Sequence, residues 1–100
     1  MTESEKQIEN EIQEKGLNAP RLTPDRIDLV IEKSEFYTFP GFKQTVCCLT
    51  LKNGFTVVGE SACVSPENYD KEIGDKIAFE NARDKIWAFE GYLLQNSLNT

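Results

Sequence analysis

Residues 65–96 read SPENYDKEIGDKIAFENARDKIWAFEGYLLQN, and this stretch decides the fold because it has the pattern of one long amphipathic helix. Ser65 is expected at the N-cap and Pro66 at the first helical position, where its missing N–H costs nothing. Val64 and Tyr69 are spaced to form a hydrophobic staple across that start. We therefore predict a helix that begins at Ser65 and packs against a core.

The apolar residues of this stretch recur at spacings of three to five, which favours a single stripe facing the core. They are Tyr69, Ile73, Ile77, Ala78, Ala82, Ile86, Phe89 and Leu93. Charged residues, Arg83 among them, are expected on the opposite, solvated face. Trp87 and Tyr92 stand partly off the stripe, so the C-terminal half of the helix is expected to contact two neighbours, one of which could be another subunit.

A β-hairpin is predicted just before the helix, because Asn53-Gly54 lies between two β-prone runs, residues 42–51 and 55–64. This dipeptide is typical of a two-residue type I′ turn, in which both central residues adopt positive φ. That turn would place Lys52 opposite Phe55 and would fix the pairing of every other residue.

With this register, both faces of the hairpin are partly apolar. The face toward the long helix would carry Leu49, Leu51, Val58 and Ala62, and the other face Val46, Cys48, Phe55, Val57 and Cys63. A sheet that is apolar on both sides needs cover on both sides. The N-terminal helices or another copy of the chain would supply it, and the second option predicts a homo-oligomer. Gly59 indicates a bulge or a close backbone approach.

The remaining elements complete an α+β fold: a small three-stranded antiparallel sheet with the Asn-Gly hairpin at its centre, packed against the long C-terminal helix. Residues 35–39 predict the third strand, closed by Pro40-Gly41. Thr23 and Pro24 predict a short helix that runs to about Lys33. We expect a polar N-terminal helix or arm over residues 1–20, a single domain over 21–96, and a tail over 97–100.

Composition excludes several classes of protein. A net charge of −6 opposes a nucleic-acid surface, which needs clustered Lys and Arg. No apolar run is long enough to span a membrane and no secretory leader is recognisable, so we expect an intracellular location and no membrane contact. Three cysteines, an odd number, fit reduced thiols better than a disulfide framework.

Several segments, in one order and spacing, resemble a known family. They are residues 50–57 (TLKNGFTV), 59–64 (GESACV), 68–70 (NYD), 72–74 (EIG), 77–78 (IA), 85–87 (KIW) and 90–94 (EGYLL). Together they are similar to a family of small bacteriophage and prophage proteins named after gene product 49 and gene product 66, over about Thr23 to Leu94. The resemblance implies expression from a phage or prophage in a bacterial cytoplasm, and it implies no catalytic residue or cofactor.

Catalytic and metal-binding patterns are weak in this sequence. Ser61 and Cys63 could be imagined as nucleophiles, but the chain has no histidine to act as the adjacent base. Cys47 and Cys48 would point to opposite faces of a strand, and no C-x-x-C is present, so we expect no metal site. The expectation is a protein that is not an enzyme and has no cofactor.

Glu60 is the carboxylate of most interest, because the predicted register places it among apolar side chains. Buried there unpaired, it would cost several kcal/mol or shift its pKa upward. It would reach the sheet edge or pair with Lys85 or Arg83, or else it would line a pocket with Trp87 or Tyr92.

Four aromatic residues surround Pro40-Gly41, namely Phe36, Tyr37, Phe39 and Phe42. Two are expected to point into the core and two to stay near the surface, where they would anchor a partner protein. With Glu60, Trp87 and Tyr92 they form the predicted interaction surface. The acidic surface could also mimic DNA, but charges of both signs alternate along the helix, which favours an ordinary solvated face.

Two functions are considered, of which the sequence patterns favour the first, while the second is a general expectation for small phage proteins. The first is a small, oligomeric, non-enzymatic accessory protein that binds a host or phage protein through its acidic and aromatic surface. The second is a protein that sequesters a small ligand, a nucleotide signal of host defence. Positive side chains in a cleft between subunits, such as Arg26, Lys33, Lys43 or Arg83, would favour the second function.

Overall fold

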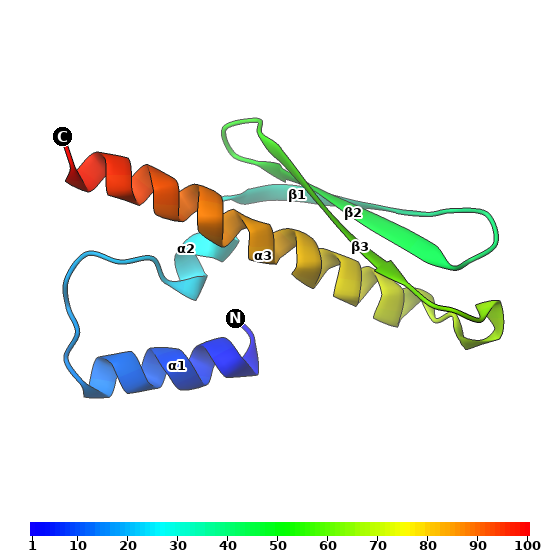
Figure 1. The fold of residues 1–100 in the computed structure, drawn as a ribbon, viewed down its shortest axis with the longest axis horizontal. Helices are drawn as coiled ribbons and strands as arrows, with labels where there is room; N and C mark the ends of the chain where they lie inside the picture. The colour runs from blue at the N-terminus through cyan, green and yellow to red at the C-terminus, as the bar shows by residue number, and fades with distance from the viewer.

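A three-stranded antiparallel sheet and one long helix form the body of the protein in the computed structural model, which describes residues 1–100 (Figure 1). The strands follow chain order in the sheet, as β1 (Ile31–Thr38), β2 (Gln44–Leu51) and β3 (Thr56–Ala62). Helix α3 (Lys71–Leu98) crosses β2 and β3, and the short helices α1 (Glu3–Glu14) and α2 (Pro24–Leu29) precede the sheet. The predicted α+β fold is confirmed.

The long helix begins at Lys71, so the predicted start at Ser65 is wrong. Asp70 is the N-cap, and its carboxylate accepts a hydrogen bond from the Ile73 N–H at 3.0 Å. Ser65 precedes only a 3₁₀ turn, Pro66–Asn68, and its side chain makes no capping bond. The extended backbone at Tyr69 separates the two segments, and the Tyr69 hydroxyl is bonded to Thr38 of β1 at 3.1 Å.

Helix α2 is shorter than predicted, because the chain enters β1 at Ile31 rather than continuing the helix to Lys33. The predicted cap is confirmed, since the Thr23 side chain accepts from the Arg26 N–H at 3.3 Å. Val30 and Ile31 are β-branched and favour extended structure. Ile31 pairs with Leu51 at the far end of the sheet, so tertiary pairing decides the boundary.

The hairpin turns at Asn53-Gly54 as predicted, but its loop has three residues rather than two. The Leu51 N–H donates to the Phe55 carbonyl at 2.8 Å, which leaves residues 52–54 in the loop. Only Gly54 has positive φ, at 90°, while the Asn53 side chain accepts from the Phe55 N–H at 3.0 Å. This is the three-residue hairpin with a left-handed last residue.

The extra loop residue shifts the pairing of β2 and β3 by one position. Leu49 lies opposite Val57, and the predicted partner Val58 lies opposite Cys48. Because side chains alternate along a strand, the shift exchanges the two faces of β3. Val57 is therefore buried under α3, and Val58 and Ala62 point to the other side, contrary to the prediction.

The core lies between the sheet and α3. It consists of Ile27, Cys47, Leu49, Leu51, Val57, Ala78, Ala82 and Ile86. Gly59 lets the helix approach closely: a Cβ atom there would lie 2.1 Å from the Ala82 nitrogen and 2.5 Å from the Ala78 oxygen. The predicted close backbone approach at Gly59 is confirmed, and three small residues bring strand and helix into contact.

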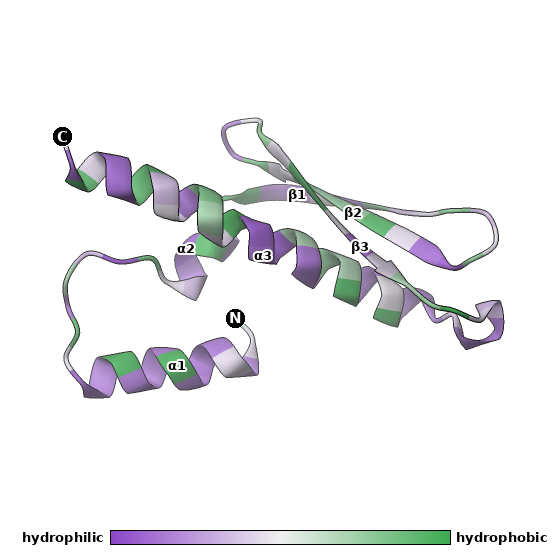
Figure 2. Ribbon diagram, in the orientation of Figure 1, coloured by the Kyte–Doolittle hydropathy of each residue, from purple (hydrophilic) through white to green (hydrophobic).

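Charged contacts hold α1 to the body, since none of its residues is buried. Figure 2 shows it as a mainly hydrophilic helix with two narrow apolar bands. Arg83 is buried, with 3% of the residue exposed, and its guanidinium pairs with Glu5 of α1 and with Asp28 of α2, each at 2.7 Å. The pattern of charged residues predicted Arg83 on the solvated face of the helix, and this prediction is wrong.

Candidate interaction surface

The sheet has one face that no helix covers. In Figure 1, α1 lies on the side of α3 away from the sheet, while α2 packs against α3 and β1 with Ile27 in the core beneath α3, so neither covers the face that α3 leaves free. We call this surface the open face and define its apolar part as Tyr37, Val46, Cys48 and Val58. Val46, Cys48 and Val58 alternate with buried residues along β2 and β3, Tyr37 of β1 lies opposite Val46, and none of the four is buried.

Polar side chains border the open face. The Gln44 amide donates to Glu60 at 2.9 Å, across β2 and β3. Lys33 pairs with Glu35 along β1 at 3.4 Å. The open face therefore has an apolar middle and a polar margin, which is the anatomy of a protein–protein contact surface.

The aromatic residues around the β1–β2 turn are all exposed, so the expectation that two enter the core is wrong. Phe36 is 40% exposed because α3 crosses β2 and β3 and leaves β1 uncovered. Tyr37 and Phe39 pack edge to face with ring centroids 4.8 Å apart, and Phe42 packs on Tyr69 at 5.6 Å. The turn presents aromatic surface on both sides of the sheet.

Glu60 lies on the open face and not beneath α3. The one-residue register shift moves it there, beside Val46, where Gln44 binds it. The predicted pairing with Lys85 or Arg83 is wrong, because Lys85 donates to the Val58 carbonyl at 2.6 Å. The carboxylate is exposed and needs no buried partner.

Trp87 and Tyr92 do not join Glu60 in a pocket. Trp87 is half-buried and lines a hollow beneath α1, together with Ile8 and Ile12. Tyr92 is 70% exposed near the end of α3. Of the seven residues predicted for the interaction surface, Tyr37, Phe39 and Glu60 share the open side of the sheet, and the others point elsewhere.

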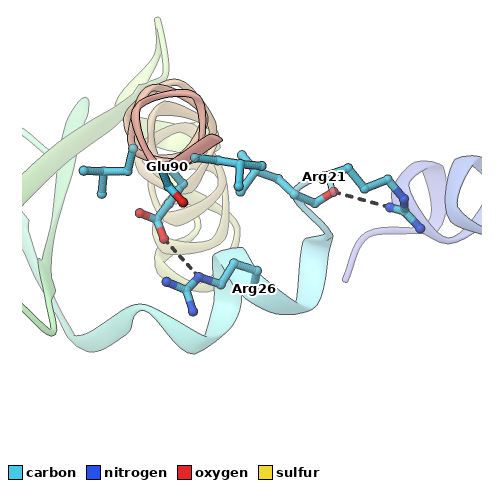
Figure 3. A pocket seen from close by; sticks show the side chains of 7 residues that line it. Arg21, Arg26 and Glu90 are labelled. Carbon is cyan, nitrogen blue, oxygen red and sulfur yellow. Dashed lines mark hydrogen bonds and ion pairs between the residues drawn. The ribbon is translucent and has the colours of Figure 1, made fainter. Parts of the chain in front are cut away.

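A buried carboxylate that the sequence pattern did not single out lies between α2 and α3. Glu90 is 8% exposed and accepts a hydrogen bond from Arg26 Nε at 3.2 Å, beside a hollow of about 340 Å³ (Figure 3). Arg21 turns away from this hollow, bonding the Leu22 carbonyl at 3.3 Å and pairing with Glu9. The sequence signal that could have predicted its burial is its spacing, since Glu90 follows the core residues Ala82 and Ile86 at intervals of four.

Carboxylates of the chain pair with three of the four cations proposed for anion binding. Arg83 is held by Glu5 and Asp28, Arg26 by Glu90, and Lys33 by Glu35. Lys43 lies at the β1–β2 turn, at the other end of the sheet from Arg26. No cationic pocket is formed within one chain.

The reactive side chains are dispersed. Burial raises the pKa of the Cys47 thiol to about 11, which keeps it protonated and weakens it as a nucleophile. Cys63 is a hydrogen-bond donor to the Phe42 carbonyl at 3.3 Å. No three His, Cys, Asp or Glu side chains gather closely enough to hold a metal ion.

Fold and surface together define a small α+β protein with one sheet face under a helix and the other face bare. The chain belongs to the phage protein family described as N4 Gp49/phage Sf6 gene 66, whose model matches residues 22–98. The match excludes α1. No curated protein and no solved structure is similar enough to count as a match. None of the helices is both long and apolar enough to cross a lipid bilayer.

Proposed function

We propose that the chain is a non-enzymatic accessory protein of a phage or prophage, working in the bacterial cytoplasm as a homo-oligomer that binds another protein. The observation that carries this proposal is the open face, with Tyr37, Val46, Cys48 and Val58 uncovered. Apolar sheet surface of this kind is normally covered in a folded protein.

The charge of the molecule indicates the chemistry of the partner. The chain carries a net charge of −6, and Glu35 and Glu60 border the open face. A partner with an apolar patch surrounded by Lys and Arg would match both features. Tyr37 and Phe39 supply the rigid aromatic contacts that usually contribute most to such a complex.

The test uses two variants that each add one carboxylate. Val58→Glu puts a charge in the middle of the open face, and Ala88→Glu puts one on the exposed side of α3. A partner identified by capture from infected bacteria is purified and its binding is measured by titration. We expect Val58→Glu to weaken binding at least about tenfold, because a carboxylate would be buried against apolar surface.

The matched variant Ala88→Glu is expected to bind like the unmodified chain. Equal binding by all three proteins would show that the open face is not the contact surface, and the proposal would be wrong. Circular dichroism of both variants checks that each keeps its fold.

A second candidate function, sequestration of a nucleotide signal, is favoured by the hollow beside Arg26, whose side chain remains 61% exposed while its Nε binds Glu90. The buried Glu90 carboxylate counts against a phosphate ligand at this place, because like charges repel. Calorimetric titration with cyclic dinucleotides tests it. Micromolar binding that Arg26→Met abolishes would support sequestration over protein binding.

A further inference from the structure

The two edges of the sheet differ in what their backbone groups contact. At the β3 edge, the Val58 carbonyl accepts from Lys85 Nζ at 2.6 Å and the Glu60 carbonyl from Asn81 Nδ2 at 2.7 Å. Both donors come from α3. The helix therefore occupies this edge, and another strand cannot pair with it without displacing two hydrogen bonds.

The β1 edge has no such protection. The Phe39 N–H donates to the Gln44 carbonyl at 2.9 Å, so the backbone of Phe39 points toward β2. Direction alternates along an antiparallel strand, so the N–H and C=O groups of Ser34 and Phe36 point outward. No side chain of the molecule bonds to them, and residues 32–37 are all exposed. An open strand edge is a template for another strand.

We propose that a second copy of this chain pairs with the β1 edge in antiparallel orientation, with Ser34 opposite Ser34 of the partner subunit. This pairing deepens the proposed function, on whose homo-oligomer it rests. The two-fold axis would stand perpendicular to the sheet. The result would be one six-stranded sheet with both α3 helices on the same side and two open faces joined into one surface.

The charged side chains of β1 favour one register of this pairing over the others. Lys33 and Glu35 lie on the same side of β1 and contact each other at 3.4 Å. Pairing about Ser34 sets Lys33 opposite Glu35 of the partner subunit, twice by symmetry, which is favourable across strands. Pairing about Lys33 or Glu35 would set like charges face to face, and pairing about Phe36 would set both charges opposite aromatic residues.

Charged residues on an edge strand usually discourage pairing. Here the two charges are self-complementary, so they discourage other registers and permit one. Both side chains are more than 60% exposed, so the ion pairs are worth little by themselves. Backbone hydrogen bonds would supply most of the attraction, and the charges would select the register.

The test exchanges the two charges. Lys33→Glu alone and Glu35→Lys alone each place like charges opposite one another in the proposed register, and the double variant K33E/E35K restores opposite charges. Light scattering at micromolar to 100 µM concentration measures the mass, with one chain being 11.4 kDa. We expect each single variant to lower the mass toward that of one chain, because two pairs of like charges would then face each other, and the double variant to recover it.

Ser34→Pro provides an independent measurement, because proline removes the outward N–H at the centre of the pairing and is tolerated on an exposed strand edge. It should also halve the mass while leaving the circular dichroism spectrum unchanged. Lys76→Glu, an exposed charge reversal on α3, should leave the mass unchanged.

A monomeric unmodified chain at 100 µM would overturn the edge pairing, and so would an oligomer whose mass none of these substitutions changes. Partner binding is measured separately with Val58→Glu. The edge pairing can therefore fail while the proposed protein-binding function stands. If the chain forms the oligomer but binds no partner protein, the edge pairing stands and the protein-binding function fails.

Discussion

The two faces of the sheet are built from alternate residues of the same strands, yet they have opposite roles. On the covered face, Cys47, Leu49 and Val57 are sealed beneath α3 and form the core. On the open face, Val46, Cys48 and Val58 stay accessible. One helix is enough to stabilise a small sheet, and the second apolar face then remains available for contacts with other molecules.

Every other element of the fold adds to the side that is already covered. Helix α2 packs against α3, and α1 is attached next to it by Arg83. These helices could have covered the open face in principle, but their attachment points lie on the other side. The difference between the faces is therefore a property of the whole chain.

The largest expected effect comes from disrupting the covered face at Gly59. Gly59→Ala would place a Cβ atom 2.1 Å from the Ala82 nitrogen, a backbone atom that cannot move aside alone. We expect a loss of about 3 kcal/mol in the free energy of unfolding, measured by urea denaturation, because the helix would have to shift away from the sheet.

Gly91→Ala is the matched control, since it adds the same methyl group to α3 at a place with ordinary space. Its Cβ would lie 3.8 Å from Leu22 Cδ1. Replacing a glycine within a helix should raise stability by up to about 1 kcal/mol. If both substitutions destabilised equally, the close packing assigned to the covered face would be wrong.

Sequence reasoning located the elements but misjudged several of their boundaries. The Asn53-Gly54 corner, the Thr23 cap and the close approach at Gly59 all have local chemical signals, and all three occur in the structure. The start of α3 was misplaced because Ser65 and Asp70 are both good N-caps. Sequence alone does not rank two adequate caps.

The open face was mispredicted in detail because a single loop residue controls it. A two-residue and a three-residue loop are both compatible with Lys52-Asn53-Gly54, and the choice between them decides whether Val57 or Val58 is buried. Arg83 and Glu90 were missed for a different reason. Their partners, Asp28 and Arg26, lie more than fifty residues away in the chain, beyond any local pattern.

The second prediction asks how firmly α1 is kept on the covered side. Arg83→Met keeps much of the apolar stem but removes the charge that binds Glu5 and Asp28. We expect a loss of about 1.5–3 kcal/mol, with faster hydrogen exchange in α1 and little change in β2. Lys76→Met, an exposed lysine, should change neither quantity.

The same contacts give α1 a defined pH dependence. Burial by itself would raise the pKa of Glu5, but the hydrogen bonds from Arg83 and from the Thr2 N–H, with the positive charges of Arg83 and the N-terminus, together outweigh burial, and the pKa lies below the ordinary 4.5. Arg21 lowers the pKa of Glu9 to about 2 by hydrogen bonding. A lowered carboxylate pKa stabilises the folded state above the unfolded pKa, and this contribution is lost as the pH falls.

Docking of α1 should therefore be complete above about pH 4.5 and should weaken steadily toward pH 2. Hydrogen exchange measured between pH 5 and 2.5, corrected for the intrinsic rate, should show α1 opening before the sheet. In Arg83→Met this acid dependence should be smaller. An equal response of α1 and the sheet to acid would contradict separate attachment.

The smallest effect, with no change in stability, comes from two neighbouring cysteines that point to opposite faces. Cys47 is fully buried and burial raises its pKa to about 11, so about one molecule in a thousand carries the thiolate at pH 8. Cys48 is partly exposed on the open face. In a Cys63→Ser background, iodoacetamide followed by peptide mass spectrometry should label Cys48 in the native protein and Cys47 only after denaturation. Slower labelling of Cys48 in the presence of a bound partner would place that partner on the open face. Equal labelling of both thiols in the native protein would show that α3 does not seal the covered face.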